Sequence, residues 1–150
     1  MINRRKDVKL YNVFFPVWML FLVPQVWLAV FPINFLVDSL ILLAGLSAWK
    51  IADKKLWYKR HIFKIFCFGL LADFIAAGFL LLMLVLEIGQ TGDDIFLTAP
   101  ATLLAGLLIY IFNCRFTFKT AEQPLRRKLS LLFAIATAPY TFLIPVTWIY

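Results

Sequence analysis

The chain has 150 residues, 63% of them hydrophobic, and its mean hydropathy is +0.89. Soluble domains are about 45–50% apolar, so this composition excludes an ordinary soluble domain and indicates an integral membrane protein. The net charge of +7 would suit a nucleic-acid-binding protein. However, the basic residues lie in short segments between apolar blocks, without a basic tail or a nucleic-acid-binding motif, so we expect no nucleic-acid partner.

The distribution of positive charge predicts how the chain is threaded through a membrane. All 15 lysine and arginine residues fall within residues 1–12, 50–64 and 115–128. The apolar blocks between them are about long enough to cross a bilayer, and basic residues accumulate on its cytoplasmic side. The pattern predicts one transmembrane domain, residues 1–150, an all-α bundle of five helices with a cytoplasmic N-terminus and an outer C-terminus. The compact topology favours a bacterial cytoplasmic (inner) membrane.

The N-terminal half is predicted to form a helical hairpin after a basic leader. The first helix covers about residues 13–31, and Pro24 is expected to kink it. The sequence FPIN at residues 31–34 is typical of a tight turn, which leads into a second helix at 33–49. The hairpin of residues 13–49 is short for two full crossings. The remainder, residues 62–150, is predicted to hold three helices at about 62–86, 95–113 and 129–150.

Two carboxylates fall inside apolar blocks. Asp73 lies about midway along the third predicted helix, where a carboxylate costs about 2.5–3.5 kcal/mol on insertion scales. Such a group needs a partner, a proton or water, so we interpret Asp73 as a site residue, with a hydrogen-bonding strut between helices as the alternative. Asp38 lies nearer the outer side, and there the strut is the preferred interpretation. The candidate substrate pathway consists of Asp73, Asp38, Gln25, Asn34 and Asn113.

The residue types needed for catalysis are missing from the sequence. It shows no nucleophile–base set, no spaced metal ligands and no phosphate-binding glycine loop. We therefore predict a protein that is not an enzyme, with no catalytic residue, metal site or cofactor. The single histidine, His61, lies among lysines, and we expect a solvated loop residue there.

A basic cluster follows the fourth predicted helix. Its members are Arg115, Lys119, Arg126 and Arg127, which could hold a lipid phosphate at the cytoplasmic surface. The alternative is an ordinary positive flank of a transmembrane helix.

The segment NCRFTFK resembles the signature that ends the second helix of the GtrA-like family of small polytopic membrane proteins. The matching residues are Asn113, Arg115, Phe116, Thr117 and Phe118. The preceding helix is similar to that family's first helix, with Lys64, Gly69 and Asp73 at the corresponding places. The resemblance covers about residues 62–147 and implies a flippase-type protein for polyprenyl-phosphate-linked sugars. The family usually has four crossings with both ends inside, whereas this chain adds a hairpin in front.

The resulting expectation is a small multi-pass protein that binds or translocates a lipid-linked or anionic amphiphile. Arg115 and its basic neighbours would engage the phosphate, and Asp73 and Asn113 would face the head group. The expected partners are membrane lipids, among them a polyprenyl-phosphate lipid, and a homo-oligomer or a larger membrane partner. Two other functions stay open. One is an accessory or assembly subunit of a membrane complex, and the other is a small proton- or cation-coupled channel or carrier that uses Asp73 and Asp38.

Overall fold

The computed structural model describes residues 24–86 and 95–140 of the chain. These residues form the helices α2 (Pro24–Ala48), α3 (Lys54–Val85), α4 (Ile95–Phe112) and α5 (Gln123–Ala136), with a π-helical turn, η1 (Asn113–Thr117). No strand occurs among the described residues, so the all-helical fold class is confirmed there. Three segments are long and apolar enough to cross a membrane: Val30–Ala48, Lys54–Met83 and Thr98–Thr117.

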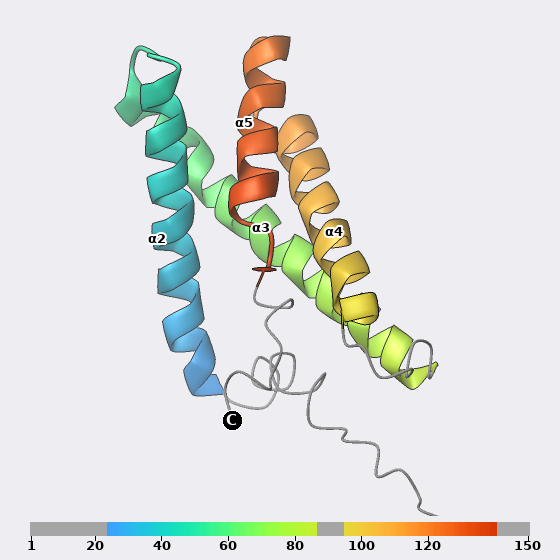
Figure 1. Ribbon diagram of the computed structural model, residues 1–150. Helices are drawn as coiled ribbons and strands as arrows, with labels where there is room; N and C mark the ends of the chain where they lie inside the picture. The colour runs from blue at the N-terminus through green and yellow to red at the C-terminus, as the bar shows by residue number, and fades with distance from the viewer. Residues whose placement is uncertain (1–23, 87–94, 141–150) are drawn as a thin grey trace, which may run out of the picture.

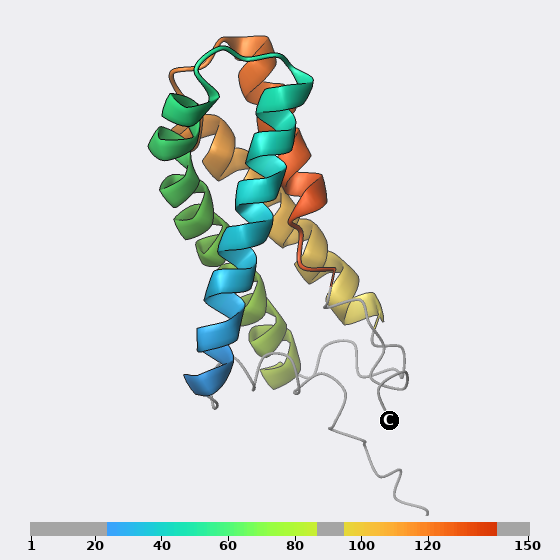
Figure 2. The ribbon, with the colours of Figure 1, turned by 90° about the vertical axis from the view of Figure 1, so that its left-hand side faces the viewer.

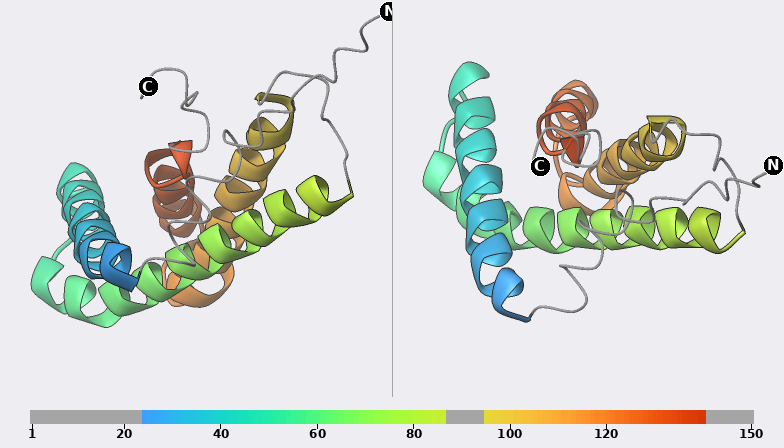
Figure 3. Two further views of the ribbon diagram at one scale, coloured as in Figure 1. Left: turned by 90° about the horizontal axis from the view of Figure 1, so that it is seen from below. Right: turned by 60° about the horizontal axis from the view of Figure 1, so that its bottom comes forward.

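The helices form an antiparallel bundle with α3 along one side. The connection from α2 to α3 and the connection from α4 to α5 lie at the same end (Figures 1 and 2). Viewed from below, α2, α5 and α4 stand in a row against α3, with α5 in the middle (Figure 3). Both connections carry basic residues, so the two inner basic segments predicted from the sequence gather at one end, called here the basic end.

The predicted hairpin of residues 13–49 is wrong where the structure describes it. α2 continues without a break through residues 31–34, with Pro32 inside the helix. A proline removes one backbone hydrogen bond, but a turn in an apolar medium would leave several backbone groups unbonded, so the helix continues. Pro24, the expected kink, is the first residue of α2. The rest of the predicted first helix lies outside the described residues, and five crossings stay a prediction.

Two further helices have boundaries that differ from the prediction. α3 begins at Lys54, not near residue 62, because the intervening lysine, arginine and leucine residues favour helix and no glycine or proline interrupts them. α5 begins at Gln123, with a proline in its first turn, and ends at Ala136, shortly before Pro139. Its 14 residues span about 21 Å, which is less than a bilayer core. The predicted continuation through residues 141–150 lies outside the described part.

Small residues bring α3 and α4 into close contact. Ala76 and Ala77 of α3 and Ala101 and Ala105 of α4 are buried in one cluster with Leu80. Small side chains let two helix backbones approach closely, which is how membrane helices commonly associate. The face of α3 that carries Asp73 therefore belongs to a packed helix interface.

α2 ends in a Schellman motif that has lysine where glycine is usual. Ile51 N–H donates to Leu46 O at 3.0 Å, and Lys50 N–H donates to Ser47 O at 3.1 Å. Lys50 has a φ of 50°, a left-handed conformation that is unfavourable for side chains with a Cβ atom.

We expect Lys50→Gly to stabilise the protein by about 1 kcal/mol, measured as a higher melting temperature in detergent. Lys50→Gln removes the same charge but keeps the strain, and it should leave the melting temperature unchanged. Equal stabilisation by both variants would contradict the strain argument.

Candidate functional site

Asp38 of α2 and Asp73 of α3 meet between the two helices. Asp38 is only 7% exposed, and its Oδ2 would lie 3.9 Å from a Cβ atom placed on Gly69. Asp73 follows Gly69 by one helical turn on the same face of α3, and its carboxylate interacts electrostatically with that of Asp38. Oδ1 of Asp73 is buried and has no hydrogen-bond partner in the described part of the chain. The structure thus brings together two carboxylates that are 35 positions apart in the sequence.

The helices around this pair supply no positive charge. α2 and α4 contain no lysine, arginine or histidine, and the last basic residue of α3 is Lys64. Lys64 lies nine residues before Asp73, about 13 Å along the helix. Burying an unpaired charge costs several kcal/mol, and a second negative charge beside it adds repulsion. The pair therefore requires a proton or a cation from outside the protein.

The pair lies well inside the candidate membrane spans. Asp38 is ten residues from the end of α2, which is about 15 Å along the helix axis and about half of a bilayer core. Asp73 lies within the Lys54–Met83 span. Ionisable groups at such depth generally face a bundle interior or a hydrated cavity and mark ion or substrate routes.

The other predicted pathway residues are not part of the Asp38–Asp73 pair. Asn34 lies one turn before Asp38 on α2 and is half-buried. Gln25 lies in the first turn of α2, and its side chain is outside the described ones. Asn113 adjoins Phe112, whose ring lies 5.5 Å from that of Phe68 on α3. Phe68 precedes Asp73 by five residues on α3, which places it about 7 Å closer to the basic end. Asn113, at the level of Phe68, is therefore separate from the carboxylate pair.

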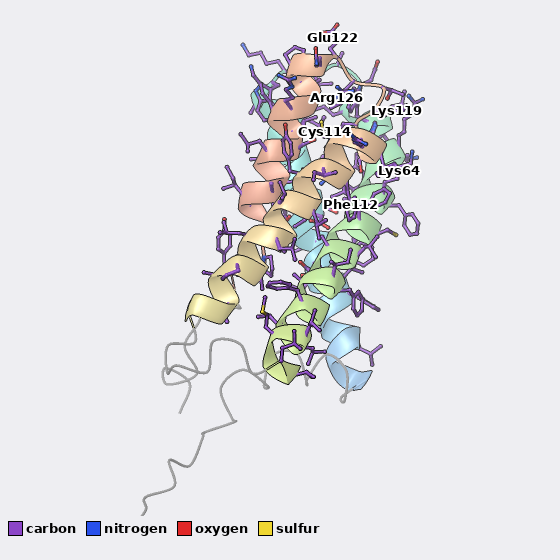
Figure 4. All side chains as sticks on the ribbon, turned by 90° about the vertical axis from the view of Figure 1, so that its right-hand side faces the viewer. Lys64, Phe112, Cys114, Lys119, Glu122 and Arg126 are labelled. Carbon is purple, nitrogen blue, oxygen red and sulfur yellow. The ribbon has the colours of Figure 1, made fainter. Side chains whose placement is uncertain are left out.

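The predicted head-group residues all lie at the basic end. Arg115, Lys119 and Arg127 are exposed, and Arg126 is half-buried. Figure 4 shows Lys119, Arg126 and Lys64 in this region, with Glu122 at its outermost edge. The ends of α2, α3, η1 and α5 therefore form a common basic surface, and its exposed residues fit a lipid site and an ordinary cytoplasmic flank equally well.

The prediction of a solvated His61 is wrong. His61 is 2% exposed, its ring stacks on Trp57 at 4.7 Å, and it lies 5.5 Å from the ring of Phe118. Its Nδ1 lies 2.8 Å from Trp57 O. The misplaced start of α3 caused the error: once the helix begins at Lys54, residues 57, 61 and 65 share the buried face. Their spacing of four was the signal in the sequence.

Comparison with known proteins adds no relative. No family model, curated protein or solved structure matches this chain. The resemblance to the GtrA-like family therefore stays a prediction. It rests on residues 113–118 and on Lys64, Gly69 and Asp73 of α3.

Proposed function

We propose that this chain is a small multi-pass membrane protein that binds a proton or a cation at the Asp38–Asp73 pair and carries it across the membrane. The observation that supports this most is the meeting of two carboxylates at membrane depth, with no basic residue on α2 or α4 and none on α3 after Lys64, about 13 Å away along the helix. A purely structural strut would join a donor to an acceptor. Two carboxylates satisfy each other only when a proton or a cation lies between them.

The charges at the two ends give the proposed orientation. The basic end holds both basic connections, so we expect it to face the cytoplasm. The opposite end joins α3 to α4 through a segment whose charged residues are all acidic, Glu87, Asp93 and Asp94. A cation would meet negative charge on the outer side, the Asp38–Asp73 pair midway, and positive charge at the inner exit.

Liposome flux tests the proposal. Purified protein is reconstituted in vesicles that contain a dye sensitive to protons, sodium or potassium, and a gradient of the matching ion is imposed. Vesicles with the protein should dissipate at least one of these gradients faster than protein-free vesicles. If vesicles with and without the protein dissipate the gradient at the same rate for each of the three ions, transport of a proton or a simple cation is rejected.

A second candidate is the binding or translocation of a lipid-linked or anionic amphiphile. The gathering of Arg115, Lys119, Arg126 and Arg127 at one end favours it, because arginine and lysine recognise phosphate head groups at the cytoplasmic surface. The Asp38–Asp73 pair would repel an anion in the interior, which is why we rank this function second.

If the protein binds such a lipid, native mass spectrometry should find a retained polyprenyl-phosphate lipid that is lost in Arg115→Ala. A stoichiometric protein partner instead of a lipid would favour an accessory subunit.

A further inference from the structure

Buried polar groups without partners gather where η1 meets α5. Asn113 and Ser130 are fully buried, and Thr117 is 3% exposed. Both amide atoms of Asn113 and the hydroxyl oxygens of Thr117 and Ser130 make no hydrogen bond within the described part of the protein, and neither does the buried Nε of Arg126. Native proteins leave few such groups unsatisfied, so each one calls for a missing partner.

The packing register places these four side chains together. A Cβ atom on Gly106 of α4 would lie 3.4 Å from Ala134 O of α5 and 3.8 Å from the Cβ of Ala138, just beyond the end of α5. The end of α5 at Ala136 therefore lies opposite Gly106, and α5 runs antiparallel to α4 (Figure 1). Ser130 then lies about 9 Å back along α5, and Asn113, the first residue of η1, lies about 10 Å beyond Gly106, at a similar level.

The next turn repeats this arrangement toward the basic end. Arg126 precedes Ser130 by four residues on the same face of α5, and Thr117 follows Asn113 by four residues in η1. Phe118 N–H donates to Asn113 O at 2.8 Å, the hydrogen bond of a π-turn. This turn buries Asn113 and Thr117 together, while Arg115 and Phe116 between them stay exposed. π-turns occur frequently at functional sites.

The chemistry of the four side chains favours an oxyanion. The asparagine amide, the two hydroxyls and the guanidinium all supply hydrogen-bond donors, arginine adds a positive charge, and none of the four is a carboxylate. A phosphate group offers several acceptor oxygens and forms charge-assisted hydrogen bonds with arginine. Arg126 is only half-buried, so a ligand can reach it from the basic end, where Lys119 and Lys64 also lie and the acidic Glu122 is exposed (Figure 4).

We propose that Asn113, Thr117, Ser130 and Arg126 form a buried site between η1 and α5 that binds a phosphate group, carried by a membrane lipid or free in the cytoplasm. The site lies closer to the basic end than the Asp38–Asp73 pair, and it depends neither on that pair nor on the proposed transport of a cation.

Calorimetric titration of the purified protein in an uncharged detergent tests this site. Two probes are used, inorganic phosphate and a short-chain phosphatidic acid. At least one of them should bind saturably, with one site per chain. Arg126→Gln and Ser130→Ala should each weaken binding about tenfold or more, because each removes a buried donor to a charged acceptor. Lys128→Gln removes the same charge from an exposed residue two positions farther along α5 and should change the affinity less than about twofold.

Each outcome has a definite meaning. Saturable binding of inorganic phosphate identifies a soluble ligand, and binding of phosphatidic acid alone identifies a lipid head group. Equal weakening by Arg126→Gln and Lys128→Gln would overturn the site in favour of surface attraction. The absence of saturable binding of both probes would overturn it as well, because ordered water would then satisfy the buried groups. Ser130→Ala is a small change that keeps the test valid if Arg126→Gln fails to fold. Asp73→Asn should bind phosphate normally whatever its effect on flux.

Discussion

Replacing Asp73 by asparagine is expected to reduce the cation or proton flux of reconstituted vesicles by about tenfold or more. The amide has nearly the shape of the carboxylate but cannot take up a proton or balance a cation, so the pair loses the chemistry that intramembrane routes use. Oδ1 of Asp73 is already buried and makes no hydrogen bond in the described part of the chain, so the fold should tolerate the change. Initial rates of gradient dissipation at matched protein content give the measurement.

The control is Asp53→Asn, which removes the same charge from an exposed residue at the basic end. Asp53 has a φ of 57°, and asparagine accepts this left-handed conformation as readily as aspartate does, so neither fold nor flux should change. Asp38→Asn should reduce the flux as Asp73→Asn does, and the double variant should be no slower than either single one, because the two groups act as a unit. Wild-type flux in Asp38→Asn and Asp73→Asn would remove the pair from the mechanism.

Gly45→Ala is expected to destabilise the protein by about 1–3 kcal/mol, the usual effect of an extra methyl group in a filled core. The added Cβ atom would lie 3.0 Å from a methyl of Leu132 and 3.1 Å from one of Leu129, both on α5. It would also lie 3.2 Å from the ring of Trp49, which directly follows α2. Leu129 is fully buried, so its methyl group has little room to retreat, and we expect α5 to shift away from α2.

Gly78→Ala is the matched control for this prediction. Gly78 lies inside α3 and is exposed, and an added Cβ atom would meet nothing within 4 Å. Alanine should therefore stabilise the helix by up to about 1 kcal/mol through its higher helix propensity. Melting temperatures of both variants in one detergent give the comparison. A Gly45→Ala variant as stable as Gly78→Ala would show that α5 does not pack against α2 as described.

Several parts of the fold follow from the sequence because they depend on composition and charge alone. Apolar blocks predict membrane helices, and the small residues around Asp73 predict a close helix contact, which Ala76 and Ala105 make. The predicted helix boundaries are wrong where a local sequence signal indicates a turn or a loop that the structure does not have. Pro32 in FPIN indicates a turn in water, but an apolar medium favours a continuous helix. The charges of residues 54–61 indicated a loop, although those residues favour helix.

The candidate site was predictable in its residues but not in its grouping. Asp38 and Asp73 stand out individually because a carboxylate at membrane depth is unusual. That they meet depends on how α2 crosses α3 at Gly69, which no local pattern encodes. Conversely, Asn113 was grouped with them on polarity alone, whereas the register of α4 on α5 places it with Ser130. Thr117 is named in the sequence only as part of the family resemblance, and Ser130 is not a candidate there, because a buried hydroxyl becomes exceptional only when its lack of a partner is known.

The most direct test of the central claim is whether positions 38 and 69 meet in the membrane. Both native cysteines, Cys67 and Cys114, are free and are first replaced by alanine. Cysteines are then introduced as Asp38→Cys and Gly69→Cys, and disulfide formation under mild oxidation is followed in native membranes. A Cβ atom at Gly69 would lie 3.9 Å from Oδ2 of Asp38, so the two side chains are within reach of each other, and we predict that this bridge forms faster than that of a distant control pair. The pair Asp38→Cys and Leu82→Cys, with the second cysteine more than two turns beyond Asp73 at an exposed position, should stay reduced. A bridge that forms no faster at 38 and 69 than at 38 and 82 would contradict the carboxylate pair, and with it the proposed cation site.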